Sequence, residues 1–327
     1  MKELLKLENI SVTFQARTGL FGSVNVKALD RVSLSLNKGE TLSIVGESGS
    51  GKTTLGRVSL KLIDPSEGNV LFNGINLNTM SNRSIKNFRR QAQGIFQDPY
   101  SSLNGFMTIY EILEEPLIVH GYKNRLERNE IVNSVLDAVK LLPVTEIAQK
   151  YPHMLSGGLR QRVGIARALT LNPEYILADE PVSMIDASNR AEILYLMKDL
   201  QQKYGVSYIY ITHDIATARH FSDKIAIMYA GRIIETGNPR EIIDDPLHPY
   251  TKALINAIPE ANAKNRMIKR EVIIGEPPSP SKLPNGCSFH PRCPSVIFGK
   301  CDTIEPEATY MNGREVKCHL YPDSKTI

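Results

Sequence analysis

The chain has 327 residues, of which 42% are hydrophobic and 23% are charged, and its formal net charge at pH 7 is +4. This composition excludes wholesale disorder, and the length predicts one large α/β unit with a further segment of several tens of residues. A net charge this small does not predict a nucleic-acid partner, although it suits a protein that works beside an anionic membrane surface.

The first residues, 1–8, contain acidic side chains and lack the continuous apolar run of a secretory signal. No stretch of the chain approaches the roughly 18 consecutive apolar residues that a membrane-spanning helix needs. We therefore expect a cytoplasmic protein, in which any role in transport depends on separate membrane subunits.

The N-terminal part has the order of elements that a phosphate-binding loop requires. Residues 4–14 and 26–36 alternate apolar and polar positions, which predicts two half-buried antiparallel strands. Residues 41–45 predict a buried strand, and residues 52–62 predict a helix that follows a glycine-rich loop.

This loop fits the pattern G-x-x-x-x-G-K-[ST], whose backbone amides surround phosphate because glycine tolerates the dihedral angles needed. Lys52 would reach the β- and γ-phosphates of a nucleotide, the Thr53 hydroxyl would bind Mg²⁺, and the helix N-terminus would add its positive dipole end. The alternative is an ordinary glycine turn between a strand and a helix. The predicted nucleotide-binding residues of this P-loop are Gly46, Glu47, Ser48, Gly49, Ser50, Gly51, Lys52, Thr53 and Thr54.

The middle of the chain predicts helices and then strands again. From about residue 98 to residue 171 apolar side chains recur at three- and four-residue spacings, which predicts a helical subdomain over 98–171. Buried strands are predicted at 175–178, 208–212 and 225–228, with a long helix at about 187–204. Strands separated by a helix imply a parallel sheet, so the predicted fold class is α/β.

Four polar residues follow strand-like runs. Asp179 ends one run, where P-loop enzymes place an Asp that holds Mg²⁺ through water, and Glu180 would polarise the attacking water. Gln97 would contact Mg²⁺ or water, and His213 would bond the γ-phosphate. The alternatives are a helix cap or solvated turn for the two carboxylates, a surface glutamine, and a capping or core histidine.

The C-terminal part has a different composition. From residue 238 onward proline and glycine accumulate, notably in 275–280, which indicates turns and irregular chain. We therefore predict two domains, 1–240 and 241–327. In a chain without a secretion signal, a cluster of cysteines indicates metal ligation before it indicates a disulfide framework. The second domain contains all four cysteines of the chain, which are Cys287, Cys293, Cys301 and Cys318.

The order of these motifs makes residues 1 to about 240 resemble the nucleotide-binding subunits of ABC transporters. The run Leu-Ser-Gly-Gly before the carboxylate strand is the most specific part of this resemblance. By this resemblance Ser156 and the amides of Gly157 and Gly158 bind the γ-phosphate of ATP held on another subunit's P-loop. Asp186 would lie in a loop that crosses the dimer interface. Phe14 would stack on adenine, with a core phenylalanine in a strand as the alternative.

Two motifs depart from the family pattern. Residue 159 is Leu where the family signature usually has Gln, and residues 184 and 185 are Met-Ile where the interface loop commonly has Ala-Leu. The serine and glycines that face the triphosphate are retained, so we expect the site that this signature completes to function.

The C-terminal part resembles the extension of oligopeptide/dipeptide importer ATPases, over residues 245–254, 275–280 and 286–294. Some members of that family carry a 4Fe-4S cluster, and the resemblance implies that the four cysteines hold such a cluster in a structural role. Their separations of five, seven and sixteen residues lack the paired C-x-x-C of common zinc sites. Zinc is the first alternative to the cluster, and free thiols or a disulfide are less favoured.

The resemblance implies an ATPase subunit that uses ATP and Mg²⁺ to drive peptide import at the cytoplasmic face of the membrane. Its partners would be a sister ATPase subunit, in a heterodimer rather than a homodimer, two transmembrane permease subunits and, indirectly, an extracellular substrate-binding protein. Oligosaccharide or nickel are the alternative substrates. Two other functional classes are disfavoured. A soluble ABC ATPase normally has two cassettes or a coiled-coil insertion, and a nucleic-acid module would need a dense basic stripe; the sequence has none of these features.

Overall fold

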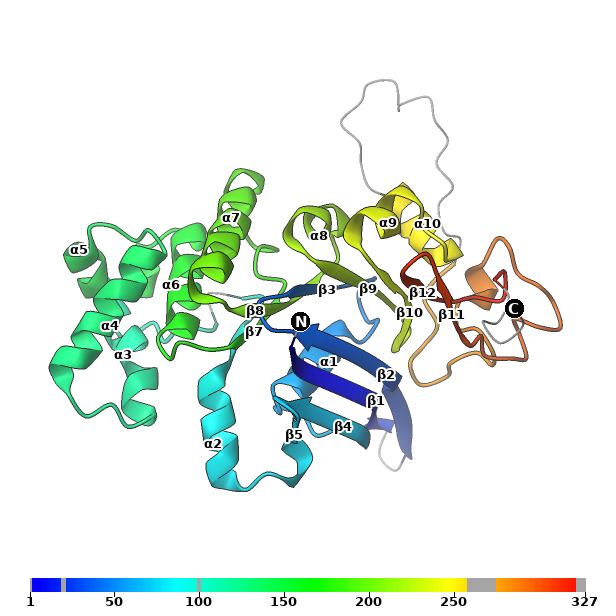
Figure 1. Ribbon diagram of the computed structural model, residues 1–327, viewed down its shortest axis with the longest axis horizontal. Coiled ribbons are helices and arrows are strands. Elements are labelled where there is room, and N and C mark those ends of the chain that lie inside the picture. The colour runs from blue at the N-terminus through cyan, green and yellow to red at the C-terminus, as the bar shows by residue number, and fades with distance from the viewer. Residues whose placement is uncertain (1, 19–21, 99–100, 258–274, 322–327) are drawn as a thin grey trace. The chain divides into compact units, whose positions relative to one another are not determined.

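The computed structural model describes residues 2–18, 22–98, 101–257 and 275–321 (Figure 1). The chain divides into two compact units. The helical unit consists of Met1–Glu3, Leu36–Glu40 and Thr79–Tyr210, and the P-loop unit consists of Leu4–Ser35, Thr41–Asn78 and Ile211–Ile327. Each unit is described separately below.

An antiparallel sheet of the order β2-β1-β4-β5 forms the first layer of the P-loop unit. In β2 the buried positions alternate from Asp30 onward, with Val32 and Leu34 turned to the core. This is the half-buried pattern that the alternating sequence predicts. The bounds are β1 Glu3–Thr18, β2 Gly22–Asn37, β4 Glu67–Phe72 and β5 Ile75–Asn76.

The second sheet of this unit contains the strand that leads into the P-loop. Strand β3 is buried throughout and pairs in parallel with β9, which pairs antiparallel with β10. The last strands of the chain extend the same sheet, because β12 pairs with β10 and β11 pairs with β12. The bounds are β3 Thr41–Val45, β9 Lys224–Tyr229, β10 Arg232–Gly237, β11 Ala308–Met311 and β12 Arg314–Lys317.

Helix α1, Lys52–Ser59, follows β3 through the P-loop. It ends three residues before the predicted position, because Leu60 caps it and Lys61 takes a left-handed conformation with φ of 54°. Helix α8, Ile215–Phe221, follows the strand predicted at 208–212 and precedes β9.

The segment after residue 238 begins with two short helices where proline and glycine indicated irregular chain. Helices α9, Pro239–Asp244, and α10, Pro249–Asn256, both start with proline. Proline suits the first helical position because an N–H at that position would have no acceptor within the helix. Tyr250 and Phe289 pack with Tyr229 of β9, with ring centroids 4.6 and 5.3 Å from the Tyr229 ring. The domain boundary at residue 240 stays a prediction, since the extension shares buried side chains with the sheet.

The helical unit contains a group of helices that pack on one another and a parallel strand pair. Strands β6 and β7 pair in parallel, from Ala92↔Tyr175 to Ile95↔Ala178, and β7 is buried along its length. The parallel pairing of β3 with β9, both of which were predicted as strands, confirms the predicted parallel arrangement. The bounds are α2 Asn82–Gln91, β6 Ala92–Ile95, α3 Ile109–Val119, α4 Arg125–Ala138, α5 Val144–Gln149, α6 Gly157–Leu169, β7 Tyr175–Asp179, α7 Ala187–Tyr204 and β8 Ser207–Thr212, which ends in the P-loop unit. Within the described ranges, no helix combines the length and the apolarity needed to cross a membrane.

Candidate functional site

The glycines of the P-loop are required by its shape. Gly49 and Gly51 have φ of +77° and +102°, in the region that favours glycine. A Cβ atom on Gly46 would lie 2.1 Å from the carbonyl oxygen of Met228, and one on Gly51 would lie 2.6 Å from that of Ala28. The loop therefore lies against the backbone of β9 and β2, and these contacts leave no room for side chains at Gly46 and Gly51.

Positive charge is concentrated where the loop enters α1. The side chain of Lys52 is buried, and its Nζ donates to the carbonyl oxygens of Gly46 and Glu47, at 2.8 Å each. The N-cap of α1 is Gly51, which has no side chain to cap the helix, and the first turn contains no acidic residue. A lysine ammonium beside uncapped helix amides is a site for an anionic phosphate group. Thr53 and Thr54 lie in the first turn, with Thr53 exposed.

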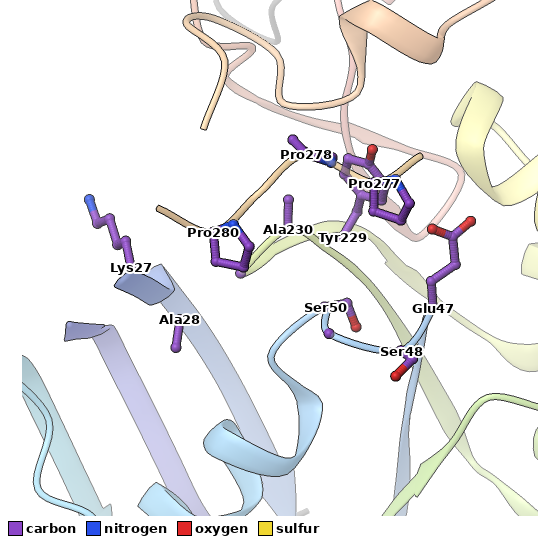
Figure 2. Close-up of a pocket in the computed structure, with 12 residues that line it drawn as sticks. Lys27, Ala28, Glu47, Ser48, Ser50, Tyr229, Ala230, Pro277, Pro278 and Pro280 are labelled. Atoms are coloured by element: carbon purple, nitrogen blue, oxygen red, sulfur yellow. The ribbon is translucent and has the colours of Figure 1, made fainter. Parts of the chain in front are cut away.

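A pocket lies beside the P-loop and is partly closed by the C-terminal extension (Figure 2). It encloses about 350 Å³ of space that includes open solvent. Figure 2 shows the three prolines of the extension on one side and the loop residues on the other. The described lining consists of Lys27, Ala28, Glu47, Ser48, Gly49, Ser50, Tyr229, Ala230, Gly231, Pro277, Pro278 and Pro280. Phe14 is outside this lining and 42% exposed on β1, so its stacking role stays a prediction.

The predicted carboxylates lie at the end of β7 in the helical unit. Asp179 is buried at the strand end, and Glu180 adopts a left-handed conformation with φ of 48°. The carbonyl oxygen of Glu180 accepts from Ser183 N at 3.1 Å, which closes a tight turn. Gln97 Nε2 donates to Glu180 Oε2 at 3.2 Å. The structure therefore brings Gln97 and Glu180 together, because β6 and β7 are parallel and end at the same edge.

The Ser-Gly-Gly turn starts α6. Ser156 is the N-cap, and its hydroxyl accepts from the backbone N–H of Leu159 at 3.4 Å. A Cβ on Gly158 would meet its nearest neighbour, Asn189, only at 3.9 Å, so this glycine is not required by packing within the chain. Asp186 is the exposed N-cap residue of α7.

His213 follows β8 and is exposed in the P-loop unit, next to Asp214, whose side chain caps α8. Its contact with a γ-phosphate stays a prediction, as do the roles of Ser156, Gly157, Gly158 and Asp186.

The four cysteines form no disulfide and lie near one another. Burial raises the pKa of Cys287 and Cys293 and raises the pKa of Cys318 to about 11, and the neighbouring thiols act in the same direction. The Ile297 amide donates to Cys301 Sγ at 3.4 Å, and backbone amides also donate to the other three sulfurs. Over the described residues, no group of three or more His, Cys, Asp or Glu side chains has the geometry to hold a single metal ion.

Sequence reasoning missed a basic residue beside the P-loop. Arg292 forms an ion pair with Glu47, with Nη1 3.0 Å from Oε2, although the two residues are 245 positions apart. The only local signal was the place of Arg292 immediately before one of the clustered cysteines.

The P-loop, the carboxylate strand and the Ser-Gly-Gly helix start define an ATP-binding cassette, and comparisons with known proteins agree. The ABC transporter family profile matches residues 29–183, and the profile of the oligopeptide/dipeptide transporter C-terminal region matches residues 234–301. The oligopeptide transport ATP-binding protein AppF of Bacillus subtilis (strain 168) is 46% identical over 324 residues, which are 97% of each chain.

Solved structures agree on the fold. The dimeric structure of MJ0796, a bacterial ABC transporter cassette, matches with a TM-score of 0.64 and 33% sequence identity. The match covers 72% of this chain and 99% of that chain. A post-hydrolysis dimer of MJ0796, bound to ADP and Pi, matches equally well. This chain belongs to the ATP-hydrolysing ABC transporter ATP-binding proteins, in the group that carries the oligopeptide/dipeptide transporter C-terminal region.

Proposed function

We propose that this chain is the ATPase subunit that energises the import of dipeptides or oligopeptides through an ABC transporter. The observation that carries the proposal is the buried Lys52 ammonium in a tightly packed P-loop, in a chain that is 46% identical to an oligopeptide transport ATP-binding protein over 97% of its length. The loop amides and Lys52 would bind the phosphates of ATP.

The hydrolytic step would use residues at the end of β7. Thr53, Gln97 and Asp179 would hold Mg²⁺, whose charge neutralises the charge that develops on the phosphates. Glu180 would orient the attacking water, and its bond from Gln97 supports this role because it fixes the carboxylate. His213 would contact the γ-phosphate.

We further propose that two such subunits enclose ATP, with the Ser156–Gly158 turn of one chain on the phosphates held by the other. The exposed position of Ser156 and the open space at Gly158 support this arrangement. The partner would be a sister ATPase subunit, and the pair would act on two permease subunits at the cytoplasmic face of the membrane, with an extracellular substrate-binding protein upstream.

The four cysteines are proposed to hold a 4Fe-4S cluster rather than zinc. The donor set fits, since four neighbouring thiols each receive a backbone N–H, and such bonds stabilise thiolates that ligate a cluster. The separations of five, seven and sixteen residues between the cysteines lack the paired C-x-x-C of common zinc sites. The group would supply four crosslinks to a segment with little apolar area to bury.

The ATPase role is tested with Glu180→Gln in the purified full chain assembled with its sister subunit. We expect Mg-ATP binding to be retained and turnover to fall by about 10²–10³-fold, because the general base is lost while the P-loop is unchanged. Undiminished hydrolysis would remove Glu180 from this role.

The transport role is tested in proteoliposomes that contain the permeases and the sister subunit. Peptide-loaded binding protein should stimulate hydrolysis by the wild type and not by Glu180→Gln, whereas stimulation by oligosaccharide or nickel instead would contradict the peptide proposal.

For the cysteine site, anaerobically purified protein should contain iron and sulfide in equal amounts, and stoichiometric zinc without iron would overturn the cluster proposal.

A further inference from the structure

A buried arginine of the C-terminal extension contacts the P-loop. The Arg292 side chain is 8% exposed and the Glu47 side chain 26% exposed. Nη1 lies 3.0 Å from Glu47 Oε2, and Nη2 lies 3.4 Å from Oε1, so the guanidinium meets both carboxylate oxygens. Such a bidentate pair fixes orientation as well as charge.

Both the side chain and the backbone of Glu47 are held from the extension. The amide of Glu47 donates to the hydroxyl oxygen of Tyr250, in α10, at 2.9 Å. Arg292 Nη1 also donates to the hydroxyl oxygen of Tyr229 at 3.3 Å, and its guanidinium lies 5.9 Å from the centroid of that ring. Glu47 therefore has little freedom to move independently of the extension.

Glu47 in turn holds the residue expected to meet phosphate. Its carbonyl oxygen accepts from Lys52 Nζ at 2.8 Å and from Ser50 N at 3.3 Å. An ionised carboxylate in a loop that receives a triphosphate repels it, unless a positive charge compensates the carboxylate. Arg292 is placed to compensate this charge.

The backbone around Arg292 is fixed by the cysteine segment. Arg292 ends the 3-10 helix His290–Arg292, which lies between Cys287 and Cys293. The Cys287 amide donates to the carbonyl oxygen of Cys301 at 2.8 Å, and Phe289 packs edge-on against Tyr229 and Tyr250.

We propose that Arg292 is a positioning residue for ATP binding: it neutralises and orients Glu47, so that Lys52 and the amides of the same chain's P-loop face the triphosphate. The extension thereby completes the nucleotide site of its own chain. This inference rests on the proposed function, since it presupposes that the P-loop binds a nucleoside triphosphate.

The test measures the Kd for Mg-ATP on the purified full chain and its variants, and kcat and KM on each of them assembled with the sister subunit. Arg292→Gln should raise both Kd and KM for ATP by at least about tenfold, because the uncompensated carboxylate repels the phosphates, and should change kcat less than about twofold. Glu47→Gln removes the repelling charge, so the double variant Arg292→Gln/Glu47→Gln should recover most of the lost affinity.

A matched control separates this contact from general docking of the extension. Arg31 pairs with Glu305, which also links the extension to β2, but neither residue lines the P-loop pocket within the described part of the chain. Arg31→Gln should leave the Kd for ATP within about twofold of wild type. If it raised Kd as much as Arg292→Gln does, the Arg292–Glu47 contact would not be the cause.

Two results overturn the inference: a folded Arg292→Gln protein with unchanged Kd, or a double variant as weak as Arg292→Gln alone. If Arg292→Gln fails to fold, Arg292→Lys keeps the charge and loses the two-pronged geometry, so it should raise the Kd for ATP by less than about tenfold, and adding Glu47→Gln should bring that Kd back toward the wild-type value. A raised Kd in Arg292→Lys that Glu47→Gln does not lower would equally reject the inference, and a wild-type Kd in Arg292→Lys would reject the orienting role of Arg292. Wild-type protein that does not bind Mg-ATP would instead refute the proposed function itself.

Discussion

The P-loop and the Ser156–Gly158 turn are both glycine-rich starts of a helix, yet their surroundings differ. A Cβ on Gly46 or Gly51 would lie under 3 Å from backbone oxygens, whereas one on Gly158 would have nothing closer than 3.9 Å. Lys52 is buried among loop carbonyls, whereas Ser156 is exposed and caps its own helix. One half of the proposed nucleotide site is pre-formed by packing within the chain, and the other half is presented to the surface.

Gly46→Ala should have the largest effect. The added methyl group would lie 2.1 Å from the Met228 oxygen, so β3 and β9 would have to separate. We expect a loss of about 1–3 kcal/mol in the free energy of unfolding and at least about 100-fold weaker ATP binding. Denaturant unfolding and equilibrium nucleotide binding measure these two quantities, and a stable variant with normal affinity would contradict the packing described for the P-loop.

Low pH should lower the free energy of unfolding through His248, which lies beside the residue that contacts the P-loop. Burial lowers the pKa of His248 to about 3, and its Nδ1 accepts from the amide of Tyr250, the residue that holds Glu47. Since the unfolded histidine has a pKa of about 6.5, its contribution to stability is complete above that pH and declines as the pH falls toward 3, by about 2 kcal/mol at pH 5.

The contribution of His248 is isolated by the variant His248→Asn, which keeps a capping oxygen and lacks the titration. Glu235 acts in the opposite direction, because burial raises the pKa of its carboxyl group. The difference in unfolding free energy between wild type and variant should shrink from pH 7 to pH 5, and a pH-independent difference would refute the assignment.

Gly158→Ala should have a smaller effect, and one of a different kind. The methyl group meets no atom closer than 3.9 Å, and alanine favours a helix over glycine, so the unfolding free energy should not fall. Hydrolysis should fall by about tenfold, because in the proposed dimer the turn would approach phosphate closely. Unchanged turnover at unchanged stability would argue against a phosphate contact at this turn.

Leu159→Gln, which restores the usual residue of the family signature, should have the smallest effect. The bond that caps α6 comes from the backbone amide of residue 159, which the substitution keeps. We expect turnover within about twofold of wild type. A tenfold gain would show that the glutamine side chain itself is needed.

The sequence was sufficient for the elements whose signal is local. The buried strand 41–45, the glycine loop and the helix at Lys52 are adjacent in the chain, and the parallel pairing of β3 with β9 follows from apolar runs separated by helices. The contact of Gln97 with Glu180 depends instead on the pairing of β7 with β6, whose residues 92–95 do not form an apolar run. Helices α9 and α10 were missed, because proline at a first turn and proline in a loop look alike in a short segment.

The sequence by itself determined the fold class, the family and the phosphate-binding loop, since each motif is formed by neighbouring residues and the order of the motifs is a property of the chain alone. Only the tertiary structure placed Arg292 on Glu47 and the prolines of residues 277–280 beside the loop. Contacts between residues 245 positions apart depend on how the extension packs against β9, and no spacing or periodicity along the chain encodes that packing.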